Sequence, residues 1–108
     1  MAKRATKSSG NVFADLGLSN AEELNLKAEL SIKIAQVMRR RGLNQTAASD
    51  LTGISQPDLS RLLRGRIREF SSDRLVEALQ HLDASVDIAV RIQGEAVGQT
   101  IHLEPIPA

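Results

Sequence analysis

The apolar positions of the chain follow helical spacing up to about residue 83 and strand spacing after it. Within residues 21–41, apolar residues recur every three or four positions: Leu26, Leu30, Ile34, Val37 and Met38. The same spacing returns after Ser71 or Ser72 and lasts to about Asp83: Leu75, Val76, Leu79 and Leu82. A stripe with this period is the buried face of an α-helix. The pattern therefore predicts a long first helix and a shorter last helix around one aliphatic core.

Two short helices are predicted between these, over residues 45–52 and from about Gln56 to Arg64. Asn44 and Ser55 can cap them, because a side-chain oxygen at the N-cap accepts a backbone N–H of the first turn. Gly53 permits a left-handed turn between the two helices. The first helix has the same kind of ends, with Ser19 or Asn20 as the N-cap and Gly42 as the stop.

After residue 85 the apolar positions alternate with other residues, which is the period of a half-buried strand. The alternating positions are Val86, Ile88, Val90 and Ile92. Gly94 and Gly98 bracket a turn, and residues 100–103 return as a second strand. An isolated hairpin is marginal in water, so we expect it to pack against a partner, for which the same hairpin of a second copy is the natural choice. The predicted fold class is mainly α, a helical bundle with a C-terminal strand or hairpin.

A chain of 108 residues has the size of one domain. Residues 1–10 are polar and carry Lys3, Arg4 and Lys7, so we expect a disordered basic tail. Residues 11–85 form the helical domain and begin with a short apolar segment. Residues 86–108 form the strand or hairpin that we expect to contribute to dimerisation.

Composition argues against several classes of protein. The chain has no cysteine, so it has no disulfide framework and no thiolate metal site. It has no apolar run of the ~20 residues that span a bilayer and no secretory signal, and we expect a cytoplasmic protein that does not contact membranes. His81 and His102 lie where a structural or exposed role is expected, with no nucleophile or ligand cluster around them. We therefore expect no enzyme, no cofactor and no metal site.

Charge is distributed unevenly along the chain, although the formal net charge is only +1. Residues 39–74 hold eight arginines and four acidic residues, a net charge of +4, and the remainder of the chain carries −3. A basic segment on a nearly neutral protein is typical of site-specific DNA binding. Three of the arginines end the first helix: Arg39, Arg40 and Arg41. They complement the helix dipole there, and the sequence leaves a contact with DNA equally open.

Residues 43–65 have the spacing of two short helices that meet at a tight turn. Ala48 is small where the helices approach, Ile54 fills the junction, and the inner face of the second helix holds it against the first through Leu59 and Leu62. These requirements leave four side chains on the outer face: Gln56, Pro57, Ser60 and Arg61. A face of this kind can enter the major groove of DNA.

This segment resembles the helix-turn-helix regulators of the lambda repressor and Cro type, the Xre family. Residues 43–65 match closely, and residues 21–83 match in outline. Members of that family open both short helices with a glutamine, eleven positions apart, as Gln45 and Gln56 do here. The resemblance implies a phosphate contact for Gln45 and base contacts for the outer face of the second helix. Pro57 departs from the usual polar residue and can offer only an apolar contact.

The resemblance also implies a homodimer on double-stranded DNA, with its two recognition helices one turn apart on an inverted repeat. Side chains at or beyond the ends of the recognition helix can hold phosphates without specifying sequence: Ser55, Arg64, Arg66 and Arg68. Regulation would then be steric, because a bound dimer blocks access of the polymerase, although activation stays open.

The flanks resemble the antitoxin-like, HigA-type branch of the same family. The similar stretches are NVFADLGLSNAEE, GRIREFSSDRL and VDIAVRI. Members of that branch often pair with a small ribonuclease toxin and repress their own operon. The alternative is a protein-interaction module that neutralises a partner without significant DNA binding, and the sequence leaves both open.

Overall fold

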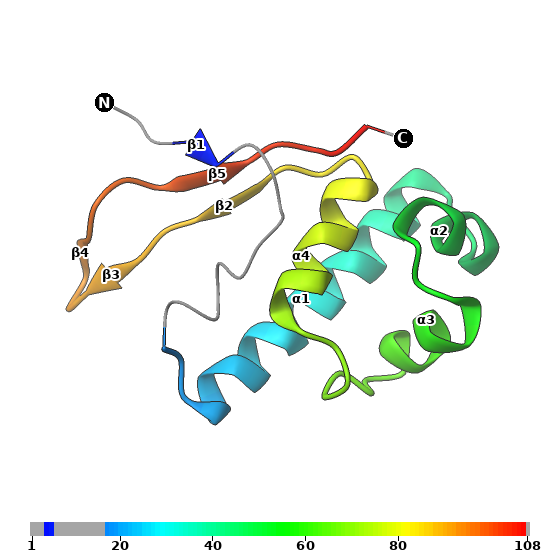
Figure 1. Cartoon of the computed structure of the whole chain (residues 1–108), viewed down its shortest axis with the longest axis horizontal. Coiled ribbons are helices and arrows are strands. Elements are labelled where there is room, and N and C mark those ends of the chain that lie inside the picture. The colour runs from blue at the N-terminus through cyan, green and yellow to red at the C-terminus, as the bar shows by residue number, and fades with distance from the viewer. Residues whose placement is uncertain (1–3, 6–16, 108) are drawn as a thin grey trace.

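The computed structural model describes residues 4–5 and 17–107 and contains four helices followed by a small β structure (Figure 1). The helices are α1 (Asn20–Arg41), α2 (Gln45–Thr52), α3 (Gln56–Leu63) and α4 (Ser72–His81). The strands are β1 (Arg4–Ala5), β2 (Val86–Ile88), β3 (Arg91–Ile92), β4 (Glu95–Ala96) and β5 (Ile101–Leu103). The predicted fold class, mainly helical with a C-terminal hairpin, is confirmed.

Helix α1 begins with a capping box and ends at a left-handed glycine. The Ser19 hydroxyl accepts the backbone N–H of Glu22, and the Glu22 carboxylate accepts the backbone N–H of Ser19. These hydrogen bonds, the backbone one first, lower the pKa of Glu22 below its usual value. Gly42 has φ 65°, and its N–H bonds back to Arg39 and Met38. Of the two predicted N-caps, Ser19 is the one used.

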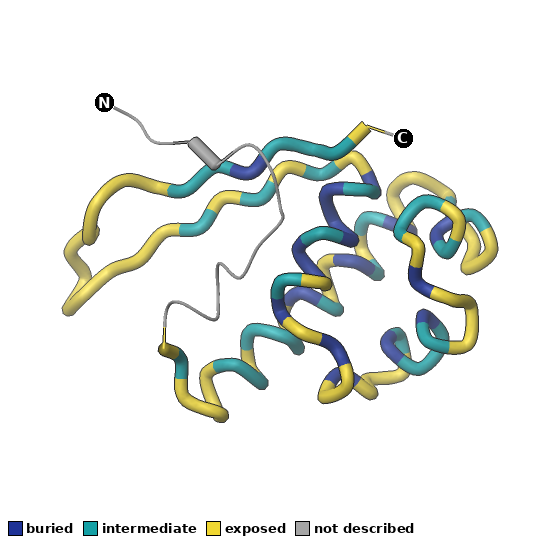
Figure 2. The backbone as a smooth tube through the Cα atoms, in the orientation of Figure 1, coloured by how far each residue is buried: buried dark blue, intermediate teal, exposed yellow. Residues whose placement is uncertain are grey.

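The core lies where α4 packs along α1, with α2 and α3 on the same body (Figures 1 and 2). Ile34 on α1 and Leu75 on α4 are completely buried. Further large buried residues come from α1, α3 and α4, from the turn between α2 and α3, and from the segments just before and after α4: Leu30, Met38, Ile54, Leu59, Leu62, Ile67, Phe70, Val76, Leu79 and Leu82. The predicted inner faces are confirmed, except that Leu26 and Val37 are only partly buried and pack against this cluster. Helix α4 ends at His81, two residues before the predicted end.

The C-terminal segment attaches to the helical body through β5 and α4. Strand β5 lies between β1 and β2, parallel to the first and antiparallel to the second. Leu103 on β5 is 1% exposed and joins the helical core. The Gln80 amide nitrogen donates to the Glu104 carbonyl over 2.7 Å, and the Ile106 N–H donates to the Gln80 carbonyl over 2.9 Å. The end of the chain is thus fixed on α4.

The predicted half-buried strand over residues 86–92 is wrong beyond Ile88. Strand β2 ends there, and the chain continues into a separate two-stranded ladder in which β3 pairs with β4. Val90 and Ile92 are exposed, because this ladder extends beyond the helical body (Figures 1 and 2). The tight turn lies at Gln93 and Gly94, where φ is positive at both residues. The predicted turn between Gly94 and Gly98 is also wrong, since β4 occupies that interval.

The N-terminal tail differs from expectation at two residues. Arg4 and Ala5 pair with His102 and Leu103 of β5 as strand β1. The outer edge of β5 offers backbone donors and acceptors that a passing extended segment can bond. The other residues of the predicted disordered tail and most of the apolar segment after it lie outside the described residues. Leu18, the last apolar residue of that segment, packs against the core. Within the described ranges, no helix has the length and apolar character that crossing a bilayer requires.

We predict that Gln80→Ala lowers the free energy of unfolding by about 1–3 kcal/mol. The side chain is fully buried, and truncation removes its hydrogen bond to Glu104 and leaves a cavity. Urea unfolding followed by circular dichroism measures the change. Gln36→Ala, at an exposed position of α1, is the matched control and should stay within about 0.5 kcal/mol of the parent protein. Equal effects of the two substitutions would show that Gln80 does not hold the C-terminal segment.

Candidate nucleic-acid interface

The turn between α2 and α3 is fixed by local hydrogen bonds. Asn44 caps α2 by accepting the Ala47 N–H over 2.8 Å. Gly53 follows α2 with φ 76°, a conformation that glycine adopts without steric cost. The Ser49 hydroxyl donates to the Ile54 carbonyl over 2.6 Å, and Ile54 itself is 1% exposed. The predicted caps, turn and apolar residue of the junction are therefore all in place.

Packing against the core sets the outward face of α3. Leu59 and Leu62 are buried to 0% and 1% exposure on the inner side of the helix. Gln56 and Pro57 are exposed in its first turn, and Ser60 and Arg61 are half-buried one turn later. Because a helix advances 100° per residue, these four positions form a face opposite the buried leucines. The structure thus brings together the four side chains predicted to contact bases.

The first turns of α2 and α3 are linked by their side chains. Gln45 and Gln56 each occupy the first position of their helix, and both are exposed. The Thr46 hydroxyl lies 3.4 Å from the Gln56 side-chain oxygen and hydrogen-bonds to it. This contact restrains the Gln56 amide in the absence of a ligand. The sequence did not predict this role of Thr46, because a single threonine near the start of a helix forms no recognisable pattern.

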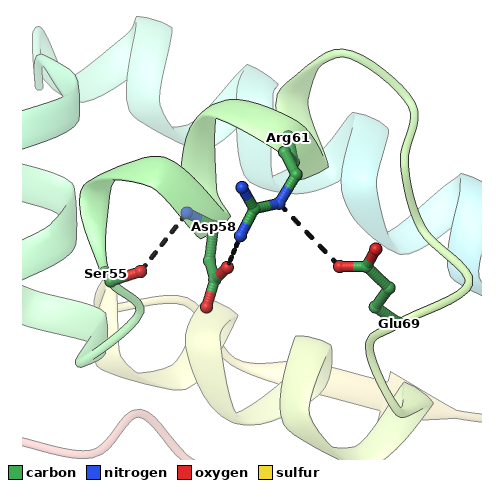
Figure 3. Close-up of polar contacts among 4 residues, drawn as sticks. All are labelled: Ser55, Asp58, Arg61 and Glu69. Carbon is green, nitrogen blue, oxygen red and sulfur yellow. Dashed lines mark hydrogen bonds and ion pairs between the residues drawn. The ribbon is translucent and has the colours of Figure 1, made fainter.

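Arg61 is held by two carboxylates (Figure 3). Its Nη2 pairs with Asp58 on the same helix, and its Nε lies 3.9 Å from Oε1 of Glu69, in the loop before α4. The Asp58 backbone N–H in turn donates to the Ser55 hydroxyl, which caps α3. The spacing of Asp58 and Arg61 is visible in the sequence as an i, i+3 pair on a helix. The contact with Glu69 depends on the path of the loop and was missed.

The segment after α3 presents a row of cations. Arg64, Arg66 and Arg68 are exposed, and they alternate with residues that anchor the segment. Ile67 is 9% exposed within the core, and the Arg68 carbonyl accepts from the Lys27 amine over 3.5 Å. The three guanidinium groups therefore stand on anchored backbone near the C-terminal end of α3. The predicted phosphate-contacting arginines are therefore exposed on the segment that directly follows the recognition helix.

The three arginines at the end of α1 have different surroundings. Arg41 extends to α4, where its Nη1 donates to the Leu82 carbonyl over 2.9 Å. That carbonyl lies at the end of α4, so a cation there also complements the helix dipole. Arg39 and Arg40 are exposed. Arg41 therefore supports the fold at the ends of two helices, its own helix α1 and the neighbouring α4.

The two histidines lie away from this face. His81 is half-buried in the last turn of α4. His102 on β5 contacts Asp87 across the β2–β5 ladder through Nδ1, and its Nε2 is 3.3 Å from the Glu104 carboxylate. Across residues 4–5 and 17–107, no three acidic or histidine side chains are grouped closely enough to hold a metal ion. The polar groups that are placed to bind a ligand are the exposed hydrogen-bonding side chains of α3 and the arginines that follow it.

Comparisons with known proteins agree with this geometry. A family model described as a helix-turn-helix domain matches residues 12–91. A solved structure assigned to the XRE family of transcriptional regulators is 34% identical and superposes with a TM-score of 0.65. The similarity covers 75% of this chain and 93% of that one. A search of curated proteins gives no match.

We predict that Arg41→Ala lowers the free energy of unfolding by about 1 kcal/mol or more, because it leaves the Leu82 carbonyl without its charged donor. Arg40→Ala removes the same charge from the neighbouring position and should change stability by less than about 0.5 kcal/mol. Thermal and urea unfolding of the two variants give the comparison. If both variants unfold like the parent protein, the hydrogen bond to Leu82 contributes nothing to the fold.

Proposed function

Because the chain belongs to the helix-turn-helix family of XRE-type regulators, we propose that it is a transcriptional regulator that binds a specific DNA operator. The observation that carries this proposal is the outward face of α3, where Gln56 and Arg61 stand on a helix fixed by buried leucines. A helix of this width and polarity fits the major groove, which presents a distinct hydrogen-bonding pattern for each base pair.

Base recognition is assigned to the four residues of that face. Gln56 can pair with adenine through its amide, and Arg61 can pair with guanine through its guanidinium, each worth about 1–3 kcal/mol of discrimination. Pro57 has no donor and would contact a thymine methyl group. Ser60, one turn further along, can donate to or accept from either kind of base edge.

Phosphate contacts are assigned to the rim of the same surface. Gln45 at the start of α2 and Ser55 at the start of α3 can face one strand of DNA through their helix N-termini. The exposed arginines after α3 supply charge: Arg64, Arg66 and Arg68. Contacts of this kind set register and make the affinity fall steeply with salt.

We further propose that the regulator is a dimer held by the β3–β4 ladder. Val90 and Val97 are opposite each other, since the Val97 N–H donates to the Val90 carbonyl over 2.8 Å. Ile92 lies two residues further along β3, so the alternation of side chains places all three on one face. Their exposed fractions are 38%, 46% and 63%. A second copy of this face would cover them, and a two-fold dimer with recognition helices about 34–36 Å apart would match an inverted repeat.

The finer biological role follows from the resemblance and stays a prediction. A dimer on its own operator would act as an autorepressor by steric exclusion of the polymerase. The antitoxin-like flanks imply a toxin partner on a surface separate from the DNA face. The alternative is a protein-interaction module that neutralises its partner without DNA binding, and the following experiment distinguishes it.

We predict that the protein retards its own upstream promoter DNA in a gel-shift salt series, and that a Gln56→Ala, Arg61→Ala double mutant loses sequence-specific binding. Loss of two base contacts should cost about 2–6 kcal/mol in discrimination. Equal binding by both proteins would show that binding is nonspecific and depends on the arginines after α3. If neither protein binds DNA, the protein-interaction module is favoured.

We predict that Ile92→Glu converts the dimer to a monomer at micromolar concentration, because it places a second carboxylate beside Glu95, its partner across the ladder, within the proposed contact. Ala96→Glu places the same charge on the opposite face of the ladder and should leave the mass unchanged. Sedimentation equilibrium measures the mass of each protein. A parent protein that is itself monomeric, or an Ile92→Glu variant that stays dimeric, would refute the role of this ladder.

A further inference from the structure

Arg61 differs from the other arginines near α3 in the charge around it. Its side chain is 38% exposed, and the guanidinium lies against Asp58 and Glu69, whose side chains are 34% and 62% exposed. The three groups together carry a formal charge of −1. Arg64, Arg66 and Arg68 are all exposed. Among these four arginines, Arg61, which is assigned to read a base, is thus the one that pairs with carboxylates in the described part of the chain.

From this arrangement we propose that Asp58 and Glu69 are specificity-determining residues for DNA binding. They hold Arg61 in place on the recognition face and offset its charge, so that Arg61 discriminates between bases and contributes little to nonspecific binding. The inference rests on the proposed function, because it concerns the same surface of α3.

The physical reason lies in the difference between a phosphate and a base edge. A phosphate attracts a cation by net charge, and two nearby carboxylates oppose that attraction. A guanine edge is uncharged and is recognised by the geometry of two hydrogen bonds. The carboxylates therefore weaken the contact with phosphate more than the contact with guanine. Nonspecific binding falls, and the ratio of specific to nonspecific affinity rises.

The geometry leaves part of the guanidinium for a ligand. The two carboxylates contact Nη2 and Nε, and Figure 3 shows the third nitrogen directed away from both contacts. Asp58 is also fixed at its backbone by the Ser55 cap. Glu69 comes from a different segment, which is anchored by the neighbouring buried residues Ile67 and Phe70. The backbone that carries each carboxylate is therefore anchored, and the two carboxylates approach Arg61 from different segments of the chain.

The decisive variant is Glu69→Gln, because Glu69 is the more exposed carboxylate and caps no helix. Glu29→Gln, at an exposed position of α1, removes the same charge and is the matched control. Dissociation constants are measured by fluorescence anisotropy for the promoter duplex and for a scrambled duplex of equal length, at several salt concentrations. Urea unfolding verifies that each variant is folded.

We expect Glu69→Gln to lower the ratio of specific to nonspecific affinity by about twofold to fivefold relative to Glu29→Gln, as befits a partly exposed ion pair. The nonspecific affinity should rise, and the difference should shrink at high salt. A ratio equal to that of Glu29→Gln would overturn the inference. If the parent protein binds both duplexes alike, the proposed function itself fails, which is a separate result.

Discussion

The contact between the inner face of α3 and the helical core is the constraint on which the recognition surface depends. A helix of eight residues has little stability of its own in water. Here the buried Leu59 and Leu62 supply the packing, Ser55 supplies the N-cap, and the Gly53 turn sets the angle of entry. Together these features fix how α3 is rotated about its own axis relative to the core. The outward direction of Gln56 is therefore a consequence of what is buried on the opposite side.

The arginines within residues 39–74 carry the same positive charge but make different contacts. Arg41 satisfies a carbonyl at the end of α4, and Arg74 lies over the ring of Phe70 at 5.2 Å from its centroid. Arg61 is balanced by Asp58 and Glu69. The number of arginines in this window therefore overstates the cation surface offered to a polyanion. In the described part of the chain, the exposed arginines that make none of these contacts are Arg39, Arg40, Arg64, Arg66 and Arg68.

The sequence predicted the helices well because their ends are determined by neighbours along the chain. The bounds of α2, its Asn44 cap and the Gly53 turn all follow from residues within a few positions of one another. What could not be predicted depends on distant segments. Whether Val90 and Ile92 are covered depends on how far the hairpin extends past the helices, which alternation does not reveal. The contact of Glu69 with Arg61 likewise requires the path of a loop. The roles of individual site residues stay predictions.

The attachment of the C-terminal hairpin gives the proposed dimer a mechanical basis. Leu103 lies in the helical core, and Gln80 bonds to the chain on both sides of Pro105. The β2–β5 ladder is thus continuous with α4, which packs along α1, the long helix that also contacts α3. A contact between two β3–β4 ladders would accordingly fix the orientation of two recognition helices through packed elements. Because half-site spacing on DNA is a rigid geometric requirement, this connection would matter as much as the affinity of the ladder face itself.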